Sequence, residues 1–295
     1  MTDTILLTVD VEDWFQVENF KPWISRSSWN GRELRVEQNC HRLLDLFEGV
    51  PGVRVRATFF ILGWIAERLP GLVQEIVSRG HEVASHGVNH ELCTSLSPRT
   101  LFNDLDRSRK VLEDLIGVQV LGYRAPSFAI SNQILSLVDK AGYAYDASYN
   151  SFEHHGRYGK IDIRGKPRQG IAIEINGHFR ELPVSNLNLS THTVPLGGGG
   201  YFRLFPFLLW QQGVHRILAR EGVYHFYMHP WEVDPDQPRV RRASAGFRFR
   251  HYVNLGTTST KLSAMIKAFD HCKFATCSQY LGRVLSEGYP CRNTP

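Results

Sequence analysis

Apolar positions along this chain follow two alternating spacings. Short β-branched or aromatic runs are separated by longer segments in which apolar residues recur at helical spacing. The predicted strands cover residues 5–10, 55–62, 81–85, 118–123, 143–146, 171–175 and 223–228. The predicted helices cover residues 34–48, 65–79, 98–116, 131–141 and 205–221, and a glycine follows each of them as a stop signal. This succession of strand, helix and glycine predicts βα units around a parallel sheet.

Two stretches depart from the alternation. Residues 147–203 are rich in Gly, Asn, Ser and His and contain four consecutive glycines at 197–200. We expect irregular excursions there, with the glycine run as a flexible connection or, alternatively, as a place where backbone closely approaches a ligand. The chain beyond Pro235 is rich in arginine and then predicts a helix at 260–269, a strand at 273–276 and a helix at 278–286. These patterns predict a catalytic domain at 1–236 and an Arg-rich C-terminal extension at 237–295 packed on it.

Composition and charge exclude several classes of protein. The 295 residues are 42% apolar and 21% charged, which is typical of a globular chain with a buried core. The net charge of +5 is too small to indicate nucleic-acid binding without a basic patch interleaved with aromatic residues. The most uniformly apolar segment, residues 57–66, is too short to span a membrane. The odd number of cysteines, five, predicts reduced thiols and no disulfide framework.

Residues capable of acid–base chemistry fall at or just after the ends of five predicted strands. They are Asp10, His86, Arg124, Asp146 and His229. The carboxyl ends of parallel strands carry the ligand site in α/β sheets and barrels, so we expect these side chains to meet in one polar site. The alternative for each residue taken alone is structural, since a strand-end aspartate is more often a turn or capping residue.

A metal site is suggested near the first and third strands. His86 and His90 are spaced so that one helical turn or a compact loop would bring both imidazoles to one side. Asp10, Glu12 and Asp13 place three carboxylates within four residues, and such crowding needs a cation or hydrogen bonds to compensate it. Two imidazoles, one carboxylate and an open position are typical of catalytic zinc.

Five motifs, taken in order, resemble the polysaccharide deacetylase family, also called the NodB-homology or carbohydrate esterase 4 family. They are TVDVEDWF at 8–15, SHGVNH at 85–90, YRAPSF at 123–128, YDAS at 145–148 and FYMHP at 226–230. The resemblance covers roughly residues 5–235 and is closer to the branch related to peptidoglycan deacetylases and allantoinase-like amide hydrolases. Residues 198–203 and 229–232, together with the Arg-rich extension, resemble members associated with exopolysaccharide biosynthesis loci. The resemblance implies an α/β fold, a distorted (β/α)7 barrel, here with a C-terminal α/β extension.

The resemblance also implies roles for the strand-end residues. Asp10 would be the general base, His86 and His90 the metal ligands, His229 the general acid, and Arg124 the arginine that fixes the base carboxylate. Asp146 would orient His229 or support Arg124.

The third metal ligand departs from the family pattern. The family has an aspartate directly after the base, but this chain has Val11 there. The branch with a carboxylate two residues after the base would place the ligand on Glu12, and Asp13 is the second choice.

The implied activity is a metal-dependent hydrolase that removes N-acetyl groups from amino sugars of a bacterial polysaccharide or its precursor. The implied cofactor is a divalent metal, Zn²⁺ in the first place, with Co²⁺ or Ni²⁺ as alternatives. Phe128, Tyr201 and Trp231 are candidates to stack on sugar rings, or are ordinary core aromatic residues. The alternatives are hydrolysis of a small cyclic amide, as in allantoinase-like relatives, and a catalytically silent carbohydrate-binding relative.

Partners and location follow from the same features. We expect an N-acetylated polysaccharide or oligosaccharide as substrate, no nucleic acid and no transmembrane segment. No secretory signal is visible at the N-terminus, so we expect a cytoplasmic protein, with action at the inner face of the membrane on a precursor as a further option. The arginines between 239 and 250 either form a solvated or internally braced face or contact an anionic polymer or a diphosphate-linked glycan.

Overall fold

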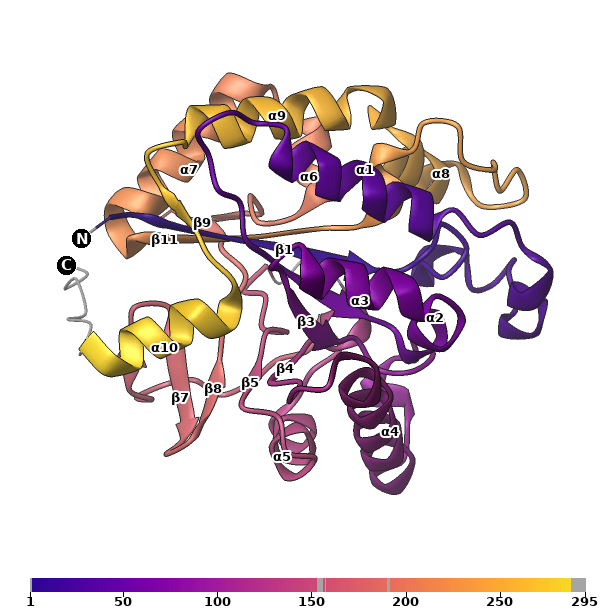
Figure 1. Ribbon diagram of the computed structural model, residues 1–295, viewed down its shortest axis with the longest axis horizontal. Coiled ribbons are helices and arrows are strands. Elements are labelled where there is room, and N and C mark those ends of the chain that lie inside the picture. Colours follow the sequence, from indigo (N-terminus) through magenta and orange to yellow (C-terminus); the bar gives the residue numbers. More distant parts are fainter. Residues whose placement is uncertain (1, 153–155, 157, 190–191, 288–295) are drawn as a thin grey trace.

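The computed structural model describes residues 2–152, 156, 158–189 and 192–287, and its centre is a mostly parallel sheet surrounded by helices (Figure 1). The strands lie in the order β11 (Val223–Met228), β1 (Thr4–Val11), β2 (Ala57–Ile61), β3 (Glu82–Ser85), β4 (Gly122–Tyr123), β5 (Tyr145–Asp146), β8 (Phe179–Glu181), β7 (Ala172–Asn176) and β6 (Arg168–Gln169). The pairings from β11 to β8 are parallel, and β7 and β6 add antiparallel strands. The predicted α/β class with a parallel sheet is confirmed.

Irregular backbone spans the gap between β8 and β11. The Ser185 amide donates to the His225 carbonyl at 3.1 Å, and the Tyr227 amide donates to the Gly197 carbonyl at 2.8 Å. Gly198 forms a further parallel bridge with Tyr227. The sheet therefore curls into a distorted barrel whose closing contacts come from loops.

The glycine run at 197–200 is a packed part of this closure, so the expectation of a flexible connection was wrong. An added Cβ would lie 2.4 Å from the Ser185 carbonyl oxygen at Gly197 and 2.3 Å from a Glu232 carboxylate oxygen at Gly199. The run also begins α6 (Gly199–Leu204), which the composition did not suggest.

Alternation along β1 separates two apolar clusters. Ile5, Leu7 and Val9 belong to the large core between the sheet and its helices, whereas Leu6 belongs to a smaller cluster with inward-facing neighbours on other strands. Successive side chains of a strand point to opposite faces, so the even-numbered residues face the barrel interior. Asp10 has the inward parity, which carries it to the carboxyl end of the barrel.

Ten helices are assigned within the described residues. They are α1 (Val36–Glu48), α2 (Gly63–Arg68), α3 (Pro70–Ser78), α4 (Pro98–Ile116), α5 (Asn132–Lys140), α6, α7 (Phe207–Glu221), α8 (Ala245–Tyr252), α9 (Thr258–Ala268) and α10 (Cys277–Glu287). The single helix predicted at 65–79 is two helices, because Leu69 leaves the helical region (φ −126°, ψ 56°) before Pro70 opens α3.

The C-terminal segment packs against the end of the barrel at which the strands begin. β12 (Lys273–Phe274) pairs in parallel with the start of β1 at Thr4 and Ile5. Tyr280, Leu281 and Val284 of α10 belong to the interior cluster, so this helix closes the end of the barrel opposite the carboxyl ends of the strands (Figure 1). The predicted domain boundary at residue 236 stays a prediction.

Neither a disulfide nor a membrane-spanning helix is found among the described residues. The cysteines at 40, 93, 272 and 277 are free thiols, while Cys291 lies outside the described residues. No helix in this part of the chain combines the length and apolar character needed to cross a bilayer.

Candidate active site

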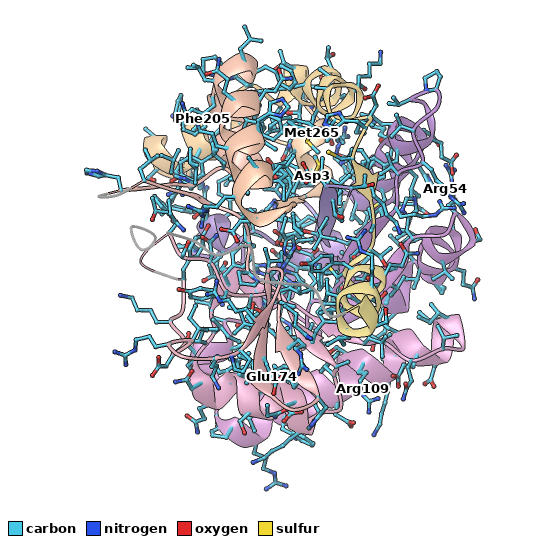
Figure 2. All side chains as sticks on the ribbon, turned by 90° about the vertical axis from the view of Figure 1, so that its left-hand side faces the viewer. Asp3, Arg54, Arg109, Glu174, Phe205 and Met265 are labelled. Atoms are coloured by element: carbon cyan, nitrogen blue, oxygen red, sulfur yellow. The ribbon has the colours of Figure 1, made fainter. Side chains whose placement is uncertain are left out.

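A cavity of about 380 Å³ opens at the carboxyl ends of the strands, and most of the predicted site residues line it. They are Asp10, Glu12, His86, His90, Phe128, Tyr201, His229 and Trp231. Asp13, Arg124 and Asp146 do not line this cavity. Figure 2 shows how densely side chains fill the molecule around the sheet. We call it the catalytic cavity.

Arg124 lies beneath the cavity and holds Asp10. Its Nη1 donates to Asp10 Oδ1 at 2.6 Å and to Thr8 Oγ1 at 2.8 Å, and its Nε donates to the Ala147 carbonyl at 2.9 Å. The guanidinium group is fully buried, so the ion pair with Asp10 is shielded from water. Arg124 thereby fixes Oδ1 of Asp10, and Oδ2 remains available to a ligand in the cavity.

His225 completes the surroundings of Arg124. Arg124 Nη2 lies 2.9 Å from His225 Nε2, and His225 Nδ1 lies 3.0 Å from the Pro183 carbonyl. Because a guanidinium only donates, His225 must accept at Nε2 and carry its proton on Nδ1. Burial, with the charge of Arg124 acting in the same direction, lowers the pKa of His225 to about 3, which keeps this tautomer neutral.

The two histidines of the SHGVNH motif present different environments. His86 Nδ1 lies 2.8 Å from the Arg124 carbonyl, so Nδ1 carries the proton and Nε2 keeps a lone pair. Burial lowers the pKa of His86 to about 4. His90 has a φ of +53°, a conformation that is uncommon outside glycine and that turns its ring towards the cavity side lined by His86. The two ring centres are 5.4 Å apart.

Glu12 lies between two histidines. Its Oε1 is 3.0 Å from His229 Nε2, and its Oε2 is 3.1 Å from His90 Nε2. The second pair is close but not aligned as a hydrogen bond, so Oε2 is a buried acceptor without a hydrogen-bond partner among the described residues. Burial alone would raise the pKa of Glu12, but His90, His229 and His86 together lower it to about 2.

His229 is held by Glu232, an acid of the 229–232 segment to which the sequence analysis assigned no role. Its Nδ1 and its backbone amide approach Glu232 Oε1 at 2.9 and 3.0 Å. Burial opposes the charged form of His229, but Glu12 and Glu232 raise its pKa to about 10. His229 is therefore a protonated imidazole whose Nε2 faces Glu12 and the cavity.

Arg203 fixes Glu232 in turn. Its Nε donates to Glu232 Oε2 at 2.7 Å, and both side chains are 1% exposed. Its Nη1 and Nη2 donate to the carbonyls of His251, Val253 and Arg250 at 3.0, 2.6 and 3.1 Å. The backbone around the end of α8 thus positions the acid that holds His229.

Asp13 and Asp146 have other partners. The Asp13 carboxylate accepts from the amides of Trp14, Arg35 and Val36 at 2.8, 2.8 and 2.9 Å, so it caps the start of α1. Asp146 accepts from the Ser148 amide and hydroxyl at 2.8 and 2.9 Å. Burial raises the pKa of Asp146, and no direct contact joins it to His229 among the described residues.

The three aromatic candidates differ in what they offer to a sugar. Trp231 is stacked between two imidazoles, with ring centres 4.9 Å from His229 and 4.0 Å from His251. Both of its faces are therefore covered. Phe128 is 4% exposed, whereas Tyr201 at the start of α6 is partly exposed and is the best placed of the three to contact a ligand.

Comparisons with known proteins indicate the family and the fold. Residues 35–145 match the family model described as polysaccharide deacetylase, and residues 147–281 match a domain of unknown function (DUF3473). Residues 35–145 therefore belong to the polysaccharide deacetylase family.

Similar proteins carry related names. The peptidoglycan deacetylase of Helicobacter pylori is 32% identical over 166 residues, which cover 50% of this chain and 56% of that protein. A peptidoglycan deacetylase-like protein of Gibberella zeae is 36% identical over 112 residues, 38% of this chain and 33% of that protein. A crystal structure titled as a polysaccharide deacetylase from Mycobacterium smegmatis matches the fold with a TM-score of 0.63 at 20% identity, over 100% of this chain and 94% of that one.

The candidate metal donors lie at the cavity but are not arranged around one point in the described structure. Among the described residues, no group of three or more His, Cys, Asp or Glu side chains is arranged to hold a metal ion. Glu12 Oε2 nevertheless lacks a hydrogen-bond partner among the described residues, and His90 faces it. His86 contacts the Arg124 carbonyl through Nδ1, so Nε2 is its nitrogen with a free lone pair. Imidazole nitrogen and carboxylate oxygen are the ligand types that Zn²⁺ takes, so the donor set fits such a cation in chemistry.

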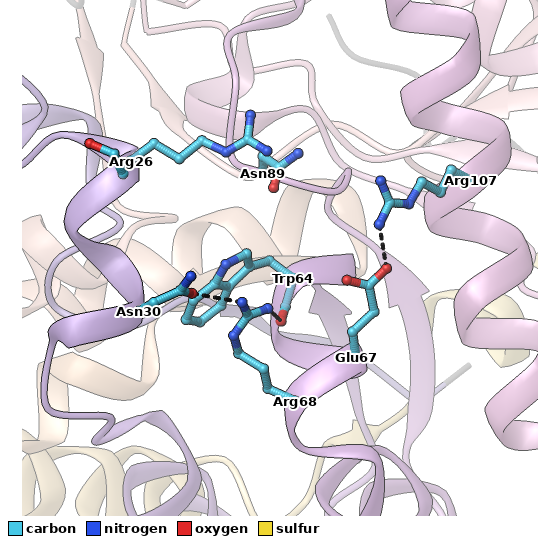
Figure 3. A pocket seen from close by; sticks show the side chains of 8 residues that line it. Arg26, Asn30, Trp64, Glu67, Arg68, Asn89 and Arg107 are labelled. Carbon is cyan, nitrogen blue, oxygen red and sulfur yellow. Dashed lines mark hydrogen bonds and ion pairs between the residues drawn. The ribbon is translucent and has the colours of Figure 1, made fainter.

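A second hollow, of about 440 Å³, lies beside the loop that carries His90 (Figure 3). Arg107 pairs with Glu67 at 2.6 Å, and Arg68 donates to Asn30 at 2.7 Å and lies over the Trp64 ring. The charged and polar groups of this hollow therefore interact largely with one another. The hollow has no carboxylate–imidazole pair, so the catalytic cavity remains the candidate active site.

Proposed function

We propose that the protein is a metal-dependent hydrolase that removes N-acetyl groups from amino sugars of a polysaccharide or its precursor. The observation that carries the proposal is the meeting of Glu12, His86, His90, Asp10 and His229 at one cavity. The names of the relatives, which are deacetylases, support it.

Glu12, His86 and His90 would hold the metal. A divalent cation, Zn²⁺ or alternatively Co²⁺ or Ni²⁺, supplies Lewis acidity towards an acetamide carbonyl and towards water when it is bound there. Glu12 Oε2 lacks a hydrogen-bond partner among the described residues, and His86 keeps the lone pair of Nε2 because its Nδ1 contacts the Arg124 carbonyl.

Asp10 and His229 would move the two protons of the reaction. Arg124 occupies Asp10 Oδ1, so Oδ2 is left to accept a proton from the water that attacks the acetamide carbon. Protonated His229 would give its Nε2 proton to the sugar nitrogen as the C–N bond breaks, which avoids release of an amide anion. The products are acetate and a free amine.

The proposal is tested by metal content and acetate release. The purified protein, dialysed against ZnCl₂ and then against metal-free buffer, is expected to retain about one zinc per chain and to release acetate from chitotetraose or a larger N-acetylated glycan. The double variant His86→Ala/His90→Ala should lose both properties.

The control removes two exposed histidines, His178→Ala/His271→Ala, whose side chains are 77% and 57% exposed. This variant should behave as wild type. Acetate release by the His86/His90 variant, or no release from any N-acetylated glycan by the zinc-loaded wild type, would contradict the proposal. Ring opening of a cyclic amide without acetate release would favour the allantoinase-like alternative.

A further inference from the structure

A third cavity, of about 530 Å³, lies on the C-terminal extension against α8. We call it the arginine cavity, and its walls are Arg239, Arg241, Ala245, Arg248, Phe249 and Tyr252. In Figure 1, α8 lies at the periphery of the molecule, away from both termini. The same helix contributes Arg250 and His251 to the catalytic cavity. The two cavities are therefore separated by one helix, whose diameter is roughly 10 Å.

The arginine cavity carries uncompensated positive charge. Its walls include three guanidinium groups and no carboxylate. Among the described residues, no ion pair joins Arg239, Arg241 or Arg248 to an acid. The hollow of Figure 3 differs, because Arg107 there is paired with Glu67. Like charges that face one cavity without partners create a positive potential that attracts anions.

Two of these guanidinium groups are already held in place. Arg239 lies over the Tyr252 ring, 4.3 Å from its centre, and the Tyr252 hydroxyl is fixed by the Val240 amide at 2.8 Å and the Pro238 carbonyl at 3.0 Å. Arg248 Nη1 donates to the Arg241 carbonyl at 3.2 Å. Each guanidinium has five N–H donors, so most of them remain available to a ligand.

We propose that the arginine cavity binds an oxyanion group of the substrate while the N-acetylated sugar occupies the catalytic cavity. This assignment to the substrate rests on the proposed function. The oxyanion is a phosphate or diphosphate on the glycan or the carboxylate of an acidic sugar, since a guanidinium binds both as a planar fork. Phe249, which is 59% exposed beside the arginines, offers an apolar face to the adjoining part of the ligand.

The experiment compares two triple variants that each remove three positive charges. Arg239→Gln/Arg241→Gln/Arg248→Gln empties the arginine cavity of charge, and Arg26→Gln/Arg68→Gln/Arg107→Gln does the same in the hollow of Figure 3. Calorimetric titration at low ionic strength uses pyrophosphate, a hyaluronan tetrasaccharide and neutral chitotetraose as probes. Thermal unfolding shows whether each variant is folded.

We expect the wild type to bind pyrophosphate or the hyaluronan tetrasaccharide, and the first triple variant to bind that probe at least tenfold more weakly. The second variant should stay within twofold of wild type, and chitotetraose binding should be unchanged in both. The anion that binds identifies the source of the oxyanion. Failure of both anions to bind, or equal weakening in both variants, would overturn the inference. If the anion binds but no acetate is released, the proposed function is wrong, whereas the assignment of the arginine cavity as an anion site remains supported.

Discussion

At the scale of single residues, the neighbours Glu12 and Asp13 have opposite surroundings. Glu12 faces two imidazoles and keeps an oxygen without a hydrogen-bond partner in the described structure. The Asp13 carboxylate accepts from three backbone amides, that of Trp14 and those of Arg35 and Val36 at the start of α1. We therefore expect Glu12 to be a metal ligand and Asp13 to stabilise the start of α1.

Separate replacement of the two acids tests this difference. Glu12→Ala should abolish retention of zinc after dialysis, because a ligand is lost. Asp13→Ala should retain the metal but lower the free energy of unfolding by about 2 kcal/mol, because three amides lose a charged capping acceptor. Metal analysis and urea unfolding of both variants check it, and loss of zinc in Asp13→Ala alone would reverse the assignment.

Glu232 is predicted to position His229 for proton transfer. Glu232→Gln keeps the shape but removes the charge that faces His229 Nδ1, so kcat for acetate release should fall about 10–100-fold with little change in KM. Steady-state kinetics of acetate release measure the effect. The control is Glu67→Gln, which alters an acid in the hollow of Figure 3 and should leave kcat unchanged. A kcat within twofold of wild type for Glu232→Gln would show that the contact is only structural.

Part of this residue-level picture could be predicted from the sequence. Asp10, His86, Arg124, Asp146 and His229 could be selected by their places at or just after strand ends, which parallel pairing brings to one end of the sheet. His90 could be selected by its spacing from His86. Glu232 follows His229 by three residues, a spacing typical of a capping acid after proline, and this signal could have found it. Arg203 could not be predicted, because its partners are backbone carbonyls about fifty residues further along the chain.

At the scale of elements, α10 fills the end of the barrel opposite the catalytic cavity. Leu281 is 7% exposed within the interior cluster, whereas Leu285 on the same helix is 46% exposed. The barrel interior would otherwise be open to water at that end.

The two leucines of α10 form a matched pair of variants. Leu281→Ala should lower the free energy of unfolding by about 3 kcal/mol, because it removes buried apolar volume and leaves a cavity. Leu285→Ala should change it by less than about 0.5 kcal/mol. Urea unfolding midpoints distinguish them, and similar midpoints would show that α10 does not seal the barrel.

Element boundaries were predictable where local chemistry sets them. α4 begins directly after Ser97, whose hydroxyl accepts from the Thr100 amide, and ends at Gly117 in the left-handed region. α8 was not predicted, because its sequence mixes arginine with aromatic residues and its buried face is the single residue His251. The strand predicted at 118–123 is only Gly122–Tyr123, since pairing partners decide the length of a strand.

At the scale of the whole molecule, buried neutral histidines link stability to pH. His81 is 6% exposed, accepts from the Ala57 amide at Nδ1, and has no partner at Nε2 among the described residues. Burial, aided by the charges of Arg56 and Arg79, lowers its pKa from 6.5 to about 4. The unfolded chain therefore binds more protons than the folded one between these values, so stability is lost as the pH falls from 6.5 towards 4.

His81→Asn should remove this part of the pH dependence. The wild type is expected to lose up to about 3 kcal/mol through His81 on acidification, whereas the asparagine variant, which can still accept from the Ala57 amide, should show a smaller difference between neutral and acid pH. Urea unfolding at several pH values measures it. His271→Asn, at an exposed position, should keep the wild-type slope, and equal slopes for all three proteins would contradict the assignment.

The place of β1 between β11 and β2 affects how the chain can be divided. The two family models meet near residue 146, yet β11 and His229 lie beyond that point. A fragment cut there would retain Asp10 and the candidate metal ligands but would lose His229, the candidate proton donor. It would also turn the first strand into a bare edge, whose free N–H and C=O groups invite pairing with another molecule. Residues 1–146 expressed alone should therefore aggregate rather than remain a stable monomer.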